Sequence, residues 1–310
     1  MISGEGGLID LVTLGIVPGG LILIMFGLGV SLRPADFLFV GRNPRAVGAG
    51  LIGQLVLMPA LAIAVSALLG LTGGLAMGLF ILAASPAGVT SNAMTHVARG
   101  NVALAVTLTV LTSSLCVVAA PLYLSWALGH YYVAADAPHL SAPATMATLA
   151  RMTVLPIAAG MAVRRLMPNA AAQIARWSRP AALVVLFSVI TLELLVSFDV
   201  VVRNLWRVGP AVFLLNVLAM TTGLALGRLM RLDRRDSLTI ALEVGIHNAT
   251  MAMYLSLTLL RSVDLAITAI IYGFVMTLNA TVFIRVMAAR GYPGDEDVAA
   301  AASTRVGASG

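Results

Sequence analysis

The sequence predicts an all-α integral membrane protein with nine transmembrane helices, on three observations. Of its 310 residues, 60% are hydrophobic and only 10% are charged, with a mean hydropathy of +0.99, whereas soluble domains are about 45–50% apolar and about 25% charged. The apolar residues form long runs without charge, and a helix needs about 20 such residues to cross a bilayer. The basic residues gather in the gaps between the runs. These features argue against a soluble enzyme, a disordered chain and a disulfide-rich secreted domain.

The uncharged runs place the nine spans in order along the chain. The first run is 11–32, and residues 46–98 leave room for two spans joined by a glycine-rich turn at Gly70–Gly74. A polar loop is expected at 129–143. The other six spans are expected at 102–128, 144–163, 180–202, 208–227, 237–260 and 265–284. Residues 291–310 are small and polar, which predicts a flexible cytoplasmic tail.

The distribution of Arg predicts the orientation in the membrane. All 19 basic residues are Arg, and 15 of them lie in the gaps after spans one, three, five and seven or beyond span nine. Cytoplasmic loops carry an excess of basic residues. We therefore expect the N-terminus outside and the C-terminus in the cytoplasm. Because topology explains the positive charge, no nucleic-acid partner is expected.

The eighth predicted span contains a cluster of polar residues. Glu243 and His247 are four residues apart and so share a helix face, with Gly245 between them and Asn248 next in the chain. One interpretation is a Glu–His pair that holds two helices together. The other is a cation site, because a carboxylate, an amide oxygen and the carbonyls freed at a helix break suit a hard cation.

The third predicted span contains a second cluster, SPAGVTSN at residues 85–92. Pro86 and Gly88 are expected to break the helix, and hydroxyl and amide side chains follow the break. Such backbone is tolerated at membrane depth only inside the protein or beside a cavity, although small residues can also serve helix packing. One broken span in each half of the chain predicts an inverted-repeat secondary transporter, with its site between the breaks.

Other polar residues carry weaker predictions. Gln54 is either a ligand or the stabiliser of a kink, and Asn279 either lines a cavity or bonds between helices. Glu193 either faces a cavity or pairs with Arg151. Cys116 is expected to be inert. The sequence has no hydrolase elbow, phosphate-binding loop or His-Glu-x-x-His motif, so we expect neither an enzyme nor an organic cofactor.

Four segments resemble the bile acid:sodium symporter family in order and spacing. They are FGLGVSLRPADF (26–37), GQLVLMPALA (53–62), SPAGVTSNAMTHVARGNVALAV (85–106) and ALEVGIHNATMAMYLSL (241–257). The resemblance extends over nearly the whole hydrophobic chain and matches the nine-span bacterial-type members.

The resemblance implies a division of the single membrane domain, 1–310, into two subdomains. The panel would comprise about 8–40 and 144–203, and the core about 45–130 and 208–290. Spans three and eight would be two crossing broken helices within the core.

The resemblance also implies two sodium positions. The first would use the side chains of Ser91, Asn92, Thr109 and Glu243. The second would use Gln54, Glu243, His247 and the backbone of Val244 and Ile246.

Two residues depart from the family pattern. Ala105 stands where the family usually has Ser, and His247 where it usually has Gln. A lost hydroxyl and an imidazole both weaken a sodium site, because imidazole prefers protons or softer metals. We therefore expect one Na⁺ and weigh proton coupling in place of the second.

The function implied is sodium-coupled symport of an organic anion, such as a bile acid or a small carboxylate, by alternating access. Substrate contacts are expected from Thr90, Asn92, Asn248 and Asn279, in a protein of the bacterial inner membrane. The alternatives are a proton-coupled or uncoupled carrier of the same fold, or a membrane sensor or scaffold that does not transport.

Overall fold

The computed structural model describes residues 11–32, 40–132, 140–196 and 198–292, and the elements within these ranges are helices. The first half of the chain forms η1 (Leu11–Ile16), α2 (Val17–Ser31), α4 (Pro44–Ile52), η2 (Gly53–Leu57), α5 (Met58–Leu68), α6 (Gly73–Ala84), α7 (Val89–Val97) and α8 (Val102–Tyr131). The second half forms α9 (Ala142–Leu149), η3 (Ala150–Val154), α10 (Leu155–Leu166), α11 (Pro168–Val196), α12 (Phe198–Leu229), α13 (Arg234–Gly245), α14 (Ala249–Met253), η4 (Tyr254–Leu259) and α15 (Val263–Ala289). The η segments are wider, π-helical turns that adjoin α-helices. Most of the predicted C-terminal tail lies outside the described residues.

Six helical stretches are long and apolar enough to cross a membrane, and the chain is therefore an integral membrane protein. These stretches are Thr13–Ser31, Pro44–Leu68, Val102–Tyr131, Ala142–Leu166, Phe198–Leu229 and Val263–Ala289. The third and eighth predicted spans are each divided into short half-helices, and α11 includes side chains outside the described set. The count of nine spans is not confirmed and stays a prediction.

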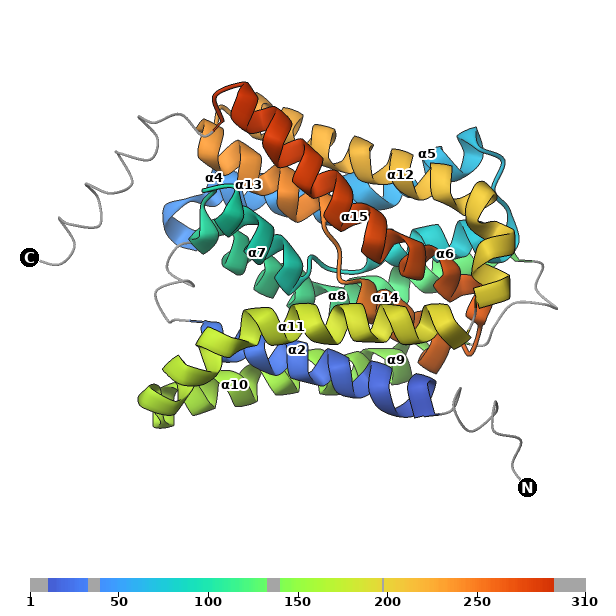
Figure 1. Cartoon of the computed structure of the whole chain (residues 1–310), viewed down its shortest axis with the longest axis horizontal. Helices are drawn as coiled ribbons and strands as arrows, with labels where there is room; N and C mark the ends of the chain where they lie inside the picture. Colours follow the sequence, from blue (N-terminus) through green and yellow to red (C-terminus); the bar gives the residue numbers. More distant parts are fainter. Residues whose placement is uncertain (1–10, 33–39, 133–139, 197, 293–310) are drawn as a thin grey trace, which may run out of the picture.

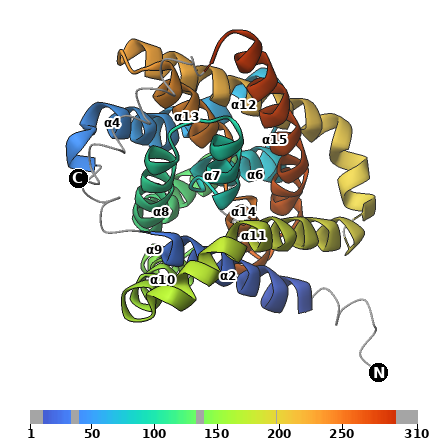
Figure 2. The same cartoon turned by 60° about the vertical axis from the view of Figure 1, so that its left-hand side comes forward.

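The helices enclose the half-helices of the two broken spans. The helices α2, α10 and α11 pack against one another along one side of the molecule (Figure 1). On the other side, α12 packs along α13 and α15, and α6 packs against α8 and α15. Figure 2 shows α6, α7, α13 and α14 surrounded by the longer helices. Non-helical backbone at membrane depth is thus placed inside the protein, where its polar groups can find partners.

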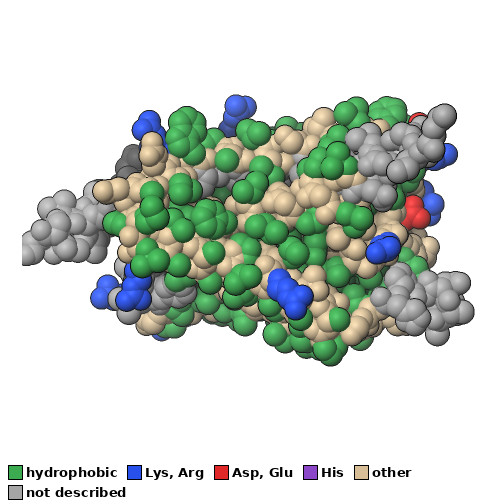
Figure 3. All heavy atoms as spheres, turned by 90° about the horizontal axis from the view of Figure 1, so that it is seen from below, with side chains coloured by type: hydrophobic (Ala, Val, Ile, Leu, Met, Phe, Trp, Pro, Cys, Tyr) green, Lys and Arg blue, Asp and Glu red, His purple; other side chains and the backbone are tan. Residues whose placement is uncertain are grey.

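The outer surface suits a bilayer. Hydrophobic side chains are spread over the whole length of the face in Figure 3, and charged side chains are few, with several of them toward its two ends. Large apolar side chains such as Leu23, Val118 and Leu122 are more than half exposed. An exposed apolar surface of this kind marks contact with lipid rather than with water.

Both helix breaks lie where the sequence predicts them. The first, Ser85–Gly88, separates α6 from α7, and Pro86 has no N–H with which to extend α6. The second separates α13 from α14 without a proline. There the Asn248 side chain caps α14, because its Oδ1 accepts a hydrogen bond of 3.0 Å from the Met251 amide.

The predicted ends of the sixth and seventh spans are wrong. The sequence predicts a gap at 164–179 and a span at 180–202, but α11 already begins at Pro168 and α12 begins at Phe198. Proline is favourable in the first turn of a helix, and a run of alanines follows it. Arg176 and Arg179, which the prediction placed in the gap between two spans, therefore lie within α11.

Candidate functional site

The two helix breaks meet at the centre of the molecule through a short antiparallel bridge. The Asn248 amide donates to the Pro86 carbonyl at 2.8 Å, and the Gly88 amide donates to the Ile246 carbonyl at 3.4 Å. Buried backbone groups need partners, because leaving them unpaired costs as much as a lost hydrogen bond. Each break therefore supplies an acceptor to the other, which ties the two broken spans together.

Gly88 allows this close approach. A Cβ atom at residue 88 would lie 3.3 Å from both the Asn248 Cα and the His247 carbonyl oxygen. Because both neighbours are backbone atoms, they cannot move aside as a flexible side chain would. The glycine thus permits the contact between the breaks.

Glu243 on α13 receives hydrogen bonds from two hydroxyl groups near this contact. Ser91 on α7 donates from Oγ to Oε1 at 2.5 Å, and Thr109 on α8 donates from Oγ1 to Oε2 at 3.0 Å. The Asn92 Oδ1 lies 3.4 Å from the Thr109 Oγ1. We call Ser91, Asn92, Thr109 and Glu243 the Glu243 cluster. The structure therefore brings together the four side chains of the first predicted sodium position.

The chemistry of the Glu243 cluster fits a hard cation. Glu243 is only 2% exposed, and in the described part of the chain its side-chain hydrogen bonds come from hydroxyls and not from Arg. A buried carboxylate without a counter-charge costs several kcal/mol. Carboxylate, hydroxyl and amide oxygens are the ligands that hard cations prefer. A sodium ion bound here would supply the missing positive charge.

Ala105 lies one turn before Thr109 on α8 and contributes no side-chain oxygen to the cluster. Its backbone carbonyl oxygen lies 3.0 Å from the Thr109 Oγ1, and the single hydroxyl proton of Thr109 is shared between this carbonyl and Glu243. The four side chains of the Glu243 cluster contact one another without a side-chain oxygen from residue 105.

Gln54 in η2 and His247 in the second break meet at the carbonyl of Ser85. The Gln54 Nε2 donates to this carbonyl at 2.9 Å and lies 3.0 Å from the His247 Nδ1. The His247 Nδ1 is also 3.0 Å from the carbonyl. The Gln54 Oε1 and the His247 Nε2 are buried and have no hydrogen-bond partner among the described residues.

Two further polar residues donate hydrogen bonds to the backbone at the second break, and neither was predicted from the sequence. Asn216 on α12 donates from Nδ2 to the Gly245 carbonyl at 2.6 Å, and the Tyr272 hydroxyl on α15 donates to the same carbonyl at 2.7 Å. They satisfy an acceptor that the end of α13 leaves free. The only available signal was an amide inside the apolar run FLLNVL.

A small cavity lies beside the two breaks, between Thr90, Asn248 and Ile24 of α2. The Asn248 Nδ2 is buried and has no partner among the described residues. Thr90 is in the first turn of α7, where the backbone N–H groups carry partial positive charge. Asn92 belongs instead to the Glu243 cluster, and Asn279 on α15 is not among the residues that line this cavity. Two of the four predicted substrate residues thus lie at it.

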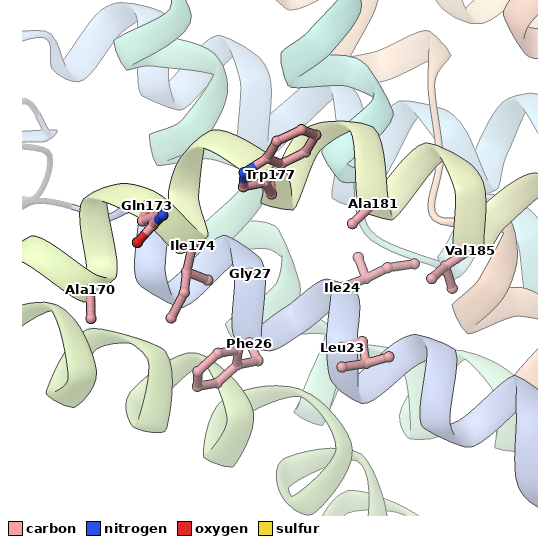
Figure 4. A pocket seen from close by; sticks show the side chains of 10 residues that line it. All are labelled: Leu23, Ile24, Phe26, Gly27, Ala170, Gln173, Ile174, Trp177, Ala181 and Val185. Carbon is pink, nitrogen blue, oxygen red and sulfur yellow. The ribbon is translucent and has the colours of Figure 1, made fainter.

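A larger groove of about 570 Å³ lies between α2 and α11 (Figure 4). Its lining is apolar apart from Gln173, and Trp177 and Val185 are among its other residues. Ile24 lines both this groove and the small cavity. The groove suits an apolar group, and the lining residues that the structure describes carry no charged side chain.

The predictions for Glu193 stay untested. The residue lies on α11, but its side chain is outside the described set, and Arg151 on η3 is exposed.

Comparison with known proteins places the chain in one family. The model of the Sodium Bile acid symporter family matches residues 18–204, more than half of the chain. The "Uncharacterized sodium-dependent transporter YocS" of Bacillus subtilis (strain 168) is 30% identical over 240 residues, which are 76% of this chain and 71% of that protein.

Two further relatives have similar names. The "Probable sodium/metabolite cotransporter BASS1, chloroplastic" of Arabidopsis thaliana is 29% identical over 237 residues, 76% of this chain and 58% of that protein. The "Sodium-dependent organic anion transporter" of Rattus norvegicus is 24% identical over 274 residues, 84% and 70% of the two chains. The chain therefore spans less than two thirds of the chloroplast relative.

Proposed function

The chain belongs to the sodium bile acid symporter family, and from this premise we propose that it is a sodium-coupled secondary transporter of an organic anion. The observation that carries the proposal is the Glu243 cluster, a buried carboxylate among hydroxyl and amide oxygens. The names of the relatives, which include a sodium-dependent transporter and a sodium-dependent organic anion transporter, support the same class of function.

The position of the cluster suggests how the ion is coupled to the substrate. Ser91 lies on α7 and Glu243 on α13, so a cation between them favours one relative position of the two broken spans. A ligand shifts a conformational equilibrium only through different contacts in the two states. Thr90 precedes Ser91 in the first turn of α7, so sodium binding orders the turn that faces the small cavity.

The organic anion places its negative group at Thr90 and Asn248 in this proposal. Asn248 lines the cavity, and its buried Nδ2 is a hydrogen-bond donor without a partner among the described residues. The N-terminus of α7 attracts an anion. Asn92 and Asn279 are the further proposed contacts. Ile24 and the groove between α2 and α11 leave room for an apolar part of the substrate.

Alternating access would move two groups of helices against each other. The packing of α2, α10 and α11 along one side supports the proposed panel, and the enclosed half-helices support the proposed core. A hydrogen bond of 2.7 Å from the Thr258 Oγ1 to the Thr13 carbonyl joins the two groups. The distribution of Arg supports an external N-terminus and a cytoplasmic C-terminus.

Uptake into proteoliposomes tests the proposal. The purified chain is reconstituted and offered a bile acid and several small carboxylates under a sodium gradient, a proton gradient or neither. We expect uptake of at least one of these anions under the sodium gradient only.

Uptake driven by protons alone would favour a second candidate, a proton-coupled carrier. That candidate rests on the imidazole of His247, which stands where the family usually has an amide. Binding of the anions without transport under any gradient would instead favour a sensor.

A further inference from the structure

The second sodium position implied by the family resemblance is where the chain departs most clearly from a sodium site. The residues concerned are Gln54, Glu243, His247 and the backbone of Val244 and Ile246. Hard cations are held by several oxygen ligands. The fit of this position therefore depends on which oxygens the residues present to it.

Gln54 presents its amide nitrogen, and not its oxygen, to the two breaks. Its Nε2 lies 2.9 Å from the Ser85 carbonyl oxygen. An amide oxygen has no proton to share with a carbonyl, so only the nitrogen end of the amide fits at this distance. The orientation of the Gln54 side chain is therefore set by Ser85, with its oxygen turned away from that carbonyl.

His247 offers nitrogen where the family pattern has an amide oxygen. Its Nδ1 lies 3.0 Å from both the Gln54 Nε2 and the Ser85 carbonyl. The ring is 1% exposed and packs edge-on against Tyr272, with ring centroids 5.8 Å apart. Because Tyr272 is itself bonded to the Gly245 carbonyl, the imidazole is held in place from both sides.

Few oxygens remain for an ion at this position. The Ile246 carbonyl already accepts the Gly88 amide. Both Glu243 carboxylate oxygens accept from the hydroxyls of the Glu243 cluster. The Gln54 Oε1, which has no partner among the described residues, and the Val244 carbonyl are then the other oxygens of this position, and two oxygens beside an imidazole do not form the oxygen shell that a hard cation needs. The Glu243 cluster, by contrast, is made of oxygen ligands.

We propose that the His247 imidazole takes the place of the second sodium ion, so that this transporter couples to a single sodium ion at the Glu243 cluster. The inference rests on the proposed function, because it requires that the first position binds sodium.

The sodium dependence of uptake tests this inference. Uptake of a saturating organic anion is measured against sodium concentration for the unaltered chain, for His247→Gln and for His130→Gln. His130 stacks on Trp126 in α8 with ring centroids 5.1 Å apart, so His130→Gln controls for the loss of an imidazole elsewhere. A Hill coefficient is limited by the number of sites, so we expect about 1 for the unaltered chain and the control, and a value rising toward about 2 for His247→Gln.

Equilibrium binding of radioactive sodium to the purified unaltered chain gives an answer even if His247→Gln does not fold. One ion per protein supports the inference, and two ions overturn it. A Hill coefficient near 2 in the unaltered chain overturns it as well, as does an active His247→Gln protein whose coefficient stays near 1. Uptake without any sodium dependence refutes the proposed function itself, a result distinct from sodium dependence with two ions.

Discussion

The two broken spans share a backbone arrangement but differ in the side chains placed around it. The bridge pairs Ala87 in the first break with His247 in the second. Four residues before the bridge, α13 carries Glu243 and α6 carries Ala83. Both side chains are buried, so the same place in the two half-helices holds a carboxylate in one and a methyl group in the other.

The half-helices after the breaks differ in a complementary way. Four residues after the bridge, α7 carries Ser91, which bonds to Glu243, whereas α14 carries Met251. The carboxylate of one span thus meets the hydroxyl of the other on one side of the bridge. On the opposite side the corresponding residues, Ala83 and Met251, are apolar. Only one of the two related places has the chemistry to hold an ion.

Each break leaves a backbone carbonyl at the end of a half-helix, and in both breaks side chains from other helices donate hydrogen bonds to that carbonyl. The Ser85 carbonyl at the end of α6 accepts from Gln54 on the preceding span. The Gly245 carbonyl at the end of α13 accepts from Asn216 and Tyr272. Satisfying the backbone is a requirement of any helix break in a membrane, whereas the ion chemistry is a property of one break only.

Substitution of the Glu243 carboxylate has the largest expected effect of the changes that test this difference between the breaks. Glu243→Gln keeps the shape of the side chain but removes the charge from the Glu243 cluster. Loss of one partner of a buried charge pair costs about 2–5 kcal/mol, so the apparent sodium affinity falls at least about thirtyfold. Sodium-driven uptake in proteoliposomes measures the change.

Asp264→Asn is the matched control, because it removes an exposed carboxylate from the first turn of α15. It should leave the sodium dependence as in the unaltered chain. If Glu243→Gln and Asp264→Asn showed the same sodium dependence of uptake, the sodium ion could not be assigned to the Glu243 cluster.

A methyl group added where the two breaks contact each other has the next largest expected effect, on thermal stability and on the uptake rate. In Gly88→Ala the new Cβ would lie 3.3 Å from backbone atoms of His247 and Asn248. Overpacking of this kind costs about 1–3 kcal/mol, so both the thermal stability and the uptake rate should fall. Asn248→Ala, at the equivalent place in the second break, removes a helix cap, so its melting temperature should fall by the equivalent of about 1 kcal/mol. Because Asn248 is also a proposed substrate contact, the two variants are compared by melting temperature and not by uptake. A Gly88→Ala protein that melts and transports like the unaltered chain would show that the breaks do not depend on close contact.

A hydroxyl restored at residue 105 has the smallest expected effect, on the apparent sodium affinity. Ala105→Ser adds an oxygen one turn before Thr109, where the family usually has serine. One more hydrogen-bonding or coordinating group contributes about 1 kcal/mol, which corresponds to an apparent sodium affinity about fivefold higher. Half-maximal sodium concentrations for uptake measure this directly. A weaker affinity in Ala105→Ser would mean that residue 105 does not face the ion.

Composition and uncharged runs were sufficient to predict a helical membrane protein and both helix breaks. Glycine among polar residues, inside an apolar run, is typical of an interrupted helix, and in the first break a proline strengthens the signal. The breaks at Ser85–Gly88 and after Gly245 are where these residues predict them. The gap at 164–179 was predicted wrongly, because Arg176 and Arg179 lie within α11 rather than between two helices.

The candidate site was predictable only in part, because its members come from distant helices. Glu243 and His247 stand out as polar residues in an apolar run, but their bonds to Ser91, Thr109 and Gln54 are tertiary contacts. The resemblance to a family supplied those partners. Asn216 and Tyr272 both donate to the Gly245 carbonyl, and no spacing in the sequence indicates that either residue lies near Gly245.

Thermal unfolding of the purified chain shows whether sodium binds at Glu243. The melting temperature is compared in sodium chloride and in potassium chloride at equal ionic strength, for the unaltered chain and for Glu243→Gln. An ion that binds only the folded state adds about 2.7 kcal/mol of stability at a hundred times its dissociation constant. We expect a higher melting temperature in sodium for the unaltered chain and no difference between the two salts for Glu243→Gln. An equal rise in both proteins would show that sodium binds elsewhere.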